Sequence, residues 1–146
     1  MKFTYRSPSR EATAIRLEEY AARFDEDGFA SWTVVLTAED RIVGWGGLNK
    51  DPGEPEWGVE VAYYFDPAYW GRGLASELVR ESLAHAFDDL HLDHVGAFTG
   101  PDNIASARVL VKNGFERTRF VAELERDEYR ISKDSWQSLA NEARAR

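Results

Sequence analysis

A strand, a glycine-containing turn and a helix are the clearest features of the hydrophobic pattern, and they lie at the centre of the chain. Apolar and polar residues alternate over 57–65, which is typical of a half-buried strand. Asp66-Pro67 ends the alternation, because proline donates no backbone hydrogen bond and restricts the residue before it. Over 74–90 the apolar residues recur with helical spacing. Gly71 and Gly73 lie between the two segments, so the pattern predicts a tight turn that leads into a helix.

The remaining segments predict an α/β fold with a mixed central sheet flanked by helices. The strand at 57–65, its crossover helix and a strand at 94–98 make a right-handed βαβ unit, so the two strands should be parallel and adjacent. Gly28 ends the first helix, and residues 50–56 form a loop by composition. Helices are also expected at 8–26, 103–113 and 132–146. The apolar positions of the first include Ile15, Leu17, Tyr20 and Phe24. The remaining strands should form a hairpin of 32–38 with 42–48 and an antiparallel pair of 115–122 with 127–132.

Composition narrows the class of protein. The 146 residues fit one domain, 1–146, and the absence of cysteine excludes disulfides, thiolate catalysis and a cysteine-ligated metal. His91 and His94 lie at a polar helix-to-strand junction, which favours a surface position over a metal site. A net charge of -8 argues against nucleic acid as a partner and is compatible with a cationic substrate. We expect a cytoplasmic protein, because no apolar run has membrane-spanning length and the N-terminus lacks a signal-peptide core.

The turn at Gly71 and Gly73 has the chemistry of an anion site. The first N–H groups of a helix have no partner within the helix, and the helix dipole adds positive potential there. Glycines allow a phosphate group to approach the backbone closely. No third glycine follows at the dinucleotide-binding spacing, and no Gly-Lys-Ser/Thr closes a P-loop. The alternative is a turn that merely fits a tight strand-to-helix connection.

Two separated motifs give the chain a specific resemblance. They are Glu60-x-x-Tyr63, continuing to Trp70-Gly-Arg-Gly-Leu-Ala75, and Asn103-x-x-Ser106-x-Arg108 with Lys112 and Gly114-Phe115. Together they resemble the GNAT superfamily of acetyl-CoA-dependent N-acetyltransferases, most of all the branch that acetylates the N-terminal alanine or serine of ribosomal proteins. The resemblance implies the acyl-CoA N-acyltransferase fold, in which strands 57–65 and 94–98 splay apart, with acetyl-CoA as cosubstrate and no metal.

The resemblance also implies a set of residues that hold the cofactor. Backbone N–H groups of residues 71–75 would hold the pyrophosphate, and the strand at Tyr63–Phe65 would pair with the pantetheine arm and face the thioester oxygen with an N–H group. Asn103 would hydrogen-bond the arm, with Arg108 and Lys112 nearby, although charged residues on a helix face are usually only solvated. The expected cofactor-binding residues are Tyr63, Tyr64, Phe65, Trp70, Gly71, Arg72, Gly73, Leu74, Ala75, Asn103, Arg108 and Lys112.

The resemblance implies two catalytic side chains. Glu60 aligns with a glutamate that would deprotonate the amine, directly or through water, and its alternative is a solvent-facing strand residue. Ser106 aligns with a serine suggested as the proton donor to the departing thiolate, and its alternative is a contact residue on a helix face. Many family members use a tyrosine seven residues after the asparagine, but that place is Leu110 here. Without cysteine to carry the acetyl group, the amine would attack the thioester directly.

Several alternatives concern the acceptor and the N-terminus. The amine would belong to a protein N-terminus or to a small molecule, and a homodimer is compatible with the family. A rival is a catalytically inactive module that binds acetyl-CoA or serves as an interaction surface. Tryptophans and Tyr63, Tyr64 and Tyr69 could line the acceptor pocket, but core packing is their commoner use. Family members usually begin with a strand and a helix, whereas only six residues precede Ser7, so we expect a truncated chain or a partner on the exposed sheet edge.

Overall fold

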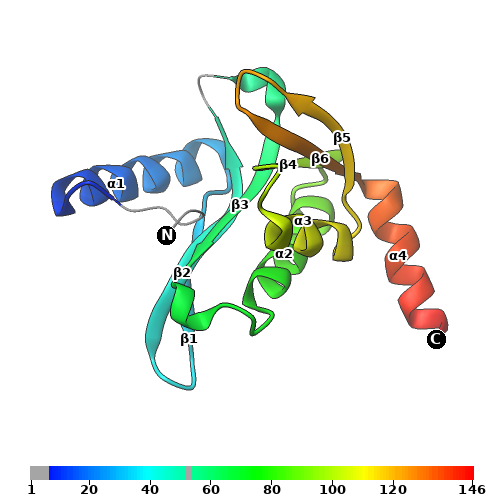
Figure 1. The fold of residues 1–146 in the computed structure, drawn as a ribbon, viewed down its shortest axis with the longest axis horizontal. Helices are drawn as coiled ribbons and strands as arrows, with labels where there is room; N and C mark the ends of the chain where they lie inside the picture. Colours follow the sequence, from blue (N-terminus) through cyan, green and yellow to red (C-terminus); the bar gives the residue numbers. More distant parts are fainter. Residues whose placement is uncertain (1–6, 52–53) are drawn as a thin grey trace.

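The computed structural model describes residues 7–51 and 54–146 (Figure 1). In this part of the chain six strands form one mixed sheet in the order β1-β2-β3-β4-β6-β5. The strands are β1 (Trp32–Leu36), β2 (Arg41–Lys50), β3 (Val59–Phe65), β4 (His94–Thr99), β5 (Glu116–Val121) and β6 (Arg126–Ser132). The helices are α1 (Arg10–Asp27), α2 (Leu74–Ala84), α3 (Ile104–Lys112) and α4 (Lys133–Ala145). The short helical turns are η1 (Pro55–Trp57), η2 (Pro67–Tyr69) and η3 (His85–Asp89).

The predicted α/β class, the hairpin of β1 with β2, the parallel pairing of β3 with β4 and the antiparallel pair of β5 with β6 are confirmed. One helix differs from its prediction. The segment 74–90 is α-helical only to Ala84, after which His85–Asp89 form a π-helical turn. In the predicted loop 50–56, residues 52 and 53 lie outside the described residues, and Pro55–Trp57 form a 3₁₀ turn.

Helix α1 is well capped but packs loosely. The Ser9 side chain accepts a hydrogen bond from the Ala12 N–H, and Gly28 ends the helix in the left-handed conformation. No residue of α1 is buried, and its apolar residues Ile15, Leu17 and Phe24 are 58%, 57% and 54% exposed. An apolar side chain at helical spacing is therefore a poor guide to burial in this element.

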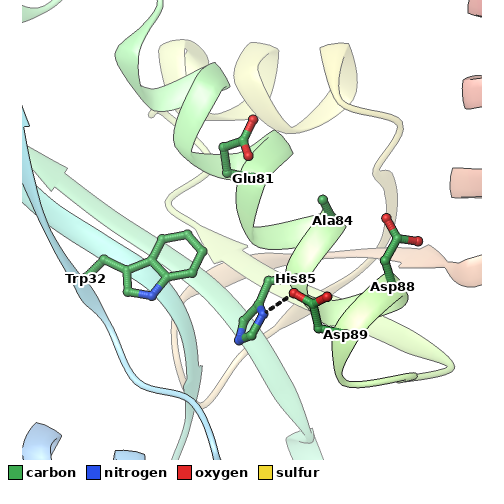
Figure 2. Close-up of a pocket in the computed structure, with 6 residues that line it drawn as sticks. All are labelled: Trp32, Glu81, Ala84, His85, Asp88 and Asp89. Atoms are coloured by element: carbon green, nitrogen blue, oxygen red, sulfur yellow. Dashed lines mark hydrogen bonds and ion pairs between the residues drawn. The ribbon is translucent and has the colours of Figure 1, made fainter.

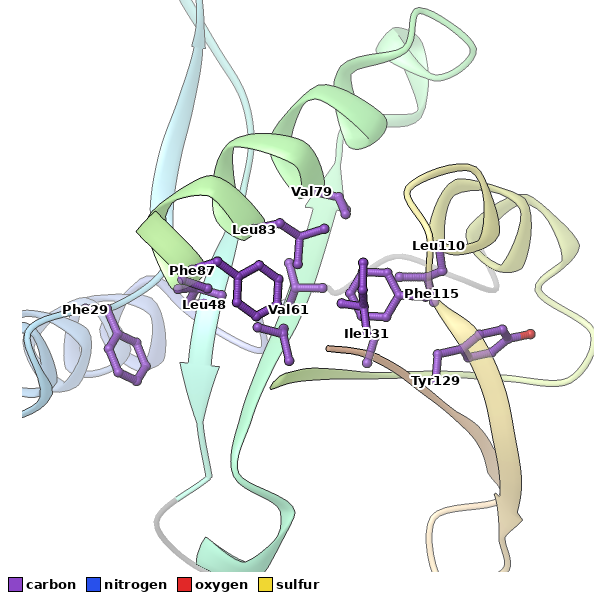
Figure 3. Packing of buried hydrophobic residues seen from close by; sticks show 13 residues of the cluster. Phe29, Leu48, Val61, Val79, Leu83, Phe87, Leu110, Phe115, Tyr129 and Ile131 are labelled. Atoms are coloured by element: carbon purple, nitrogen blue, oxygen red, sulfur yellow. The ribbon is translucent and has the colours of Figure 1, made fainter. Parts of the chain in front are cut away.

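The core lies between the sheet and the helices α2 and α3. Figure 3 shows side chains of α2, β3 and α3 meeting around Phe87 and Phe115. Gly46 of β2 permits this packing, because a Cβ there would lie 2.7 Å from the Tyr63 Cα and 2.8 Å from a Leu78 methyl carbon. The fully buried side chains include Leu48, Val79, Leu83, Val95 and Leu110.

Strands β3 and β4 diverge after a single point of pairing. Among the residues that the structure describes, the two strands are paired only at Glu60 and Gly96. Side chains alternate across a strand, so Tyr63 lies on the face covered by α2 and α3, whereas Glu60 and Tyr64 lie on the other face. Figure 1 shows α1 on this second side of β2 and β3, where Tyr20 contacts Trp45 with ring centroids 5.9 Å apart. Beyond Glu60, the edge of β3 next to β4 is therefore unpaired and open to both faces of the sheet.

Candidate active site

The glycine turn (residues 70–73) connects the end of β3 to the first turn of α2 through η2. The indole N–H of Trp70 donates a 2.9 Å hydrogen bond to the Phe65 carbonyl, which ties the turn to the end of β3. Gly71 and Gly73 have φ values of 76° and 79°, and a Cβ at either position would meet no heavy atom within 4 Å. Open space therefore lies beside these two glycines, next to helix N–H groups that have no partner within α2. The predicted strand, turn and helix are confirmed, and their role in anion binding stays a prediction.

The side chain of Arg72 contacts Glu39 and Tyr69. Its guanidinium lies 3.9 Å from a Glu39 oxygen and 4.8 Å from the centroid of the Tyr69 ring. The Tyr69 hydroxyl in turn donates a 2.8 Å hydrogen bond to Glu39. These contacts hold the turn against the β1–β2 hairpin.

A hydrogen bond joins β3 to the start of α3. Tyr63 Oη lies 2.8 Å from Ser106 Oγ, and the Ser106 N–H donates to the Asn103 side-chain oxygen at 3.2 Å. Burial raises the pKa of Tyr63, and the hydrogen bond with Ser106 lowers it only in part. The structure therefore brings together three residues predicted separately, with Tyr63 three positions beyond the last contact of β3 with β4.

Glu60 is the residue of β3 that pairs with Gly96 of β4, and its pKa is unusually high for a glutamate. Burial, with a smaller contribution from the negative charge of Asp51, raises the pKa of Glu60 from 4.5 to about 7, and Arg126 opposes the shift. Its cross-strand neighbour is Asn49 of β2, whose side-chain oxygen accepts a hydrogen bond from Arg23 of α1 at 3.3 Å. A carboxyl group that is half ionised near neutral pH can both accept and release a proton, which is the requirement for a general base.

Arg108 and Lys112 lie one helical turn apart and line a hollow of about 430 Å³ on α3. The residue after Lys112 connects this end of α3 to the start of α2, because the Asn113 amide donates a 3.0 Å hydrogen bond to Ser76 in the first turn of α2. The C-terminal end of α3 therefore lies near the N-terminus of α2. Pro101, Ile104, Ala107 and Val111 complete the lining of the hollow.

A second hollow, of about 260 Å³, lies between β1 and the C-terminal part of α2 (Figure 2). The Trp32 and His85 rings face each other with centroids 5.8 Å apart, and His85 Nδ1 lies 2.8 Å from an Asp89 oxygen. None of the predicted site residues lines it, and nothing in the sequence pattern indicated it. In the ranges 7–51 and 54–146 no group of three or more His, Asp or Glu side chains is arranged to hold a metal ion, and no helix there is long and apolar enough to span a membrane.

The family is established by comparison with known sequences. Residues 1–116 match the model of the acetyltransferase (GNAT) domain. The chain belongs to the GNAT family. The Bacillus subtilis protein YjcK, named as a probable N-acetyltransferase, is 30% identical to this GNAT chain over 102 residues, which cover 70% of the chain and 56% of YjcK. The chain spans between 54% and 61% of the length of the first five curated relatives that it matches.

Solved structures share the fold of this GNAT domain. The ribosomal-protein-S5-alanine acetyltransferase of Vibrio fischeri superposes with a TM-score of 0.74 at 22% identity, covering 91% of this chain and 79% of that one. The yncA protein of Salmonella typhimurium, named as a putative acetyltransferase and solved with its cofactor acetyl-CoA, gives a TM-score of 0.70 at 20% identity, covering 84% of this chain and 74% of that one. These likenesses concern the fold alone.

The sequence did not indicate the hydrogen bond of the Tyr63 hydroxyl. Tyr63 was expected to act through its main chain, as part of the strand that pairs with the pantetheine arm. The alternation over 57–65 correctly places its side chain on the same face as Val61 and Phe65. A contact between residues 63 and 106, however, depends on how α3 packs against β3, and the local pattern carries no signal for it.

Proposed function

We propose that this chain is an N-acetyltransferase that transfers the acetyl group of acetyl-CoA to a primary amine by direct attack. Membership of the GNAT family supports acetyl-CoA as cosubstrate. The observation that carries the proposal is the pairing of Glu60, with its pKa of about 7, to Gly96 at the point where β3 and β4 diverge. Glu60, as the proposed base, would then lie beside an unpaired strand edge, where an extended cosubstrate would bind.

The residues present fit acetyl-CoA, which supplies an activated acetyl group when bound. Gly71 and Gly73 leave open space beside the N-terminus of α2, so the N–H groups of residues 71–75 would hold the pyrophosphate. Lys112, at the end of α3 nearest the first turn of α2, and Arg108 would add positive charge. Residues Tyr63, Tyr64 and Phe65 of β3, and Asn103 before α3, would hold the pantetheine arm across the divergence of the strands.

Glu60 would accept the proton of the attacking amine. It lies on the α1 side of β3, together with the stacked rings of Trp45 and Tyr64, whose centroids are 4.5 Å apart. An amine that approaches from this side meets a carboxylate and two aromatic rings, which suit a cationic group before it loses its proton. The acceptor face would therefore be the α1 side, consistent with the negative net charge of the chain.

Ser106 would supply the proton to the departing sulfur. It belongs to the first turn of α3, on the opposite side of β3 from Glu60, and its hydroxyl is held by Tyr63. Leu110 is 2% exposed and packs in the core, so the position that holds tyrosine in many relatives contributes no acid here. A base on one face would act on the amine nitrogen and an acid on the other face would act on the departing sulfur, so the two groups would not compete for one proton.

The acceptor would be a protein N-terminus or a small amine. The protein would be cytoplasmic, with a single domain that covers 1–146. Calorimetric titration with acetyl-CoA should give binding, and release of free coenzyme A should then require an amine. A panel of peptides with N-terminal alanine or serine, polyamines and amino sugars ranks the acceptors. Binding without amine-dependent release from any acceptor would favour the inactive binding module, and no binding by the folded chain would contradict both.

A further inference from the structure

The hydroxyl of Ser106 has a defined partner. Tyr63 Oη lies 2.8 Å from Ser106 Oγ and 3.5 Å from the Ser106 carbonyl oxygen. The Ser106 N–H is held by Asn103 at 3.2 Å. When the Tyr63 hydroxyl donates to Ser106 Oγ, the hydrogen of Ser106 is left to point at another acceptor. Main chain and side chain of Ser106 are thus both fixed beside the diverging strands.

Serine alone is poorly matched to the protonation of a thiolate. Efficient proton transfer needs an acid whose pKa is close to that of the group it protonates. A thiol ionises near pH 8.5 and a phenol near pH 10, whereas an alcohol hydroxyl holds its proton throughout the usual pH range. The phenol of Tyr63 is therefore the better proton source, and Ser106 is the group placed to pass a proton on.

We propose that Tyr63 and Ser106 act as one acid, an inference that rests on the proposed acetyl transfer. As the amine nitrogen bonds to the acetyl carbon, the carbon–sulfur bond breaks and its electron pair goes to sulfur. Ser106 gives its hydroxyl proton to that sulfur and takes the phenol proton of Tyr63. Glu60 has accepted the amine proton, and water returns one proton from Glu60 to Tyr63. At the end of the exchange Glu60, Ser106 and Tyr63 have the same protons as at the start.

The surroundings of the pair suit this role. Ser106 lies in the first turn of α3, where the helix dipole stabilises the negative charge that develops on sulfur. Burial raises the pKa of Tyr63, so its hydroxyl is protonated over the usual pH range and has a proton to give to Ser106. Ser106 is the catalytic residue of the two, because it would touch the sulfur. Tyr63 is a positioning residue that acts through Ser106.

Four variants and one control test the pair, with amine-dependent release of coenzyme A and the acetyl-CoA Kd measured for each. Tyr63→Phe removes only the hydroxyl and should lower kcat about tenfold or more while the Kd stays within about twofold of the wild type. Ser106→Ala should lower kcat at least as much, and Ser106→Thr should recover most of it. The double variant Tyr63→Phe/Ser106→Ala should be no slower than Ser106→Ala, because residues that act as a unit are not additive. Tyr129→Phe, a buried tyrosine of β6, controls for hydroxyl loss in the core and should keep kcat.

The outcomes separate this inference from the proposed function. An active wild type with a Tyr63→Phe variant of unchanged kcat would overturn the inference and leave acetyl transfer intact. Multiplicative losses in the double variant, or a loss that follows the acetyl-CoA Kd, would also overturn it. A wild type that releases no coenzyme A with any amine would overturn both. Thermal unfolding of each variant shows whether a loss of activity reflects a loss of folded protein.

Discussion

Glu60 of β3 is paired with Gly96 of β4 at the point where the two strands begin to diverge. This pairing fixes the Glu60 carboxyl group, whose pKa is raised to about 7, at the closed end of the divergence. Tyr63, three residues further along β3, is joined to Ser106 on the other face of the sheet. The topology therefore puts the proposed base, Glu60, and the proposed acid, Ser106, on opposite faces of one strand.

The first prediction concerns the pH dependence of turnover. A base must be ionised to accept a proton, so kcat at saturating acetyl-CoA should rise with pH through an apparent pKa of about 7, the value of Glu60. Glu60→Gln should lower kcat about 100-fold or more with the acetyl-CoA Kd kept, and the inflection near pH 7 should vanish. The acceptor amine also titrates, and the comparison of the two profiles isolates Glu60. A variant with wild-type turnover at every pH would remove Glu60 as the base.

The second prediction tests the glycine turn. Gly73→Glu places a side chain and a negative charge in the open space at the N-terminus of α2, so the acetyl-CoA Kd should rise about 100-fold or more. Gly28→Glu is the matched control, because Gly28 also has a positive φ, 80°, and open surroundings, but ends α1. It should keep the wild-type Kd. Gly73→Lys imposes the same backbone strain with the opposite charge and should lose less affinity than Gly73→Glu. Equal Kd values for Gly73→Glu and the wild type would refute the assignment.

The sequence was most informative where the structure is local. The alternation over 57–65, the break at Asp66-Pro67 and the paired glycines predicted β3 and the start of α2, because proline and glycine restrict the backbone whatever surrounds them. The βαβ handedness rule then gave the parallel pairing of β3 with β4. The family motifs added the expectation of splayed strands, and the pairing of the described parts of β3 and β4 at one position, Glu60 with Gly96, agrees with it.

What the sequence could not supply depends on packing between distant segments. The Tyr63–Ser106 hydrogen bond joins residues 43 positions apart, and the raised pKa of Glu60 arises from burial that no local pattern reveals. The exposure of Ile15 and Phe24 has the same origin, because helical periodicity shows which residues share a face and not whether anything covers it. The π-helical turn at 85–89 likewise has no local signature in the sequence.

The third prediction concerns Gly46, which lies opposite Tyr63 in the β2–β3 pair. A Cβ at this position would lie 2.5 Å from the Ala62 carbonyl oxygen and 2.8 Å from a Leu78 methyl carbon, so Gly46→Ala forces β2, β3 and α2 apart. We expect a loss of about 2–3 kcal/mol in the free energy of unfolding, measured with urea. At Gly96 a Cβ would meet its neighbours at 3.8 Å, an ordinary contact, so Gly96→Ala should change stability by less than about 0.5 kcal/mol. Similar values for the two variants would contradict the packing argument.

The last prediction is that the raised pKa of Glu60, which suits its proposed role as a base, carries a cost in stability. In the unfolded chain Glu60 ionises near its ordinary pKa of 4.5, whereas in the folded chain it holds its proton up to about pH 7. The folded state binds the extra proton between these values, so the contribution of Glu60 to stability falls as pH rises from about 4.5 to about 7 and stays low above. Glu60→Gln should therefore be more stable than the wild type at pH 8, by about 1–3 kcal/mol, and equal to it near pH 4. Urea unfolding of both proteins at the two pH values measures this difference. A variant that is less stable at pH 8 would mean that its surroundings stabilise the ionised carboxylate, which is incompatible with a raised pKa.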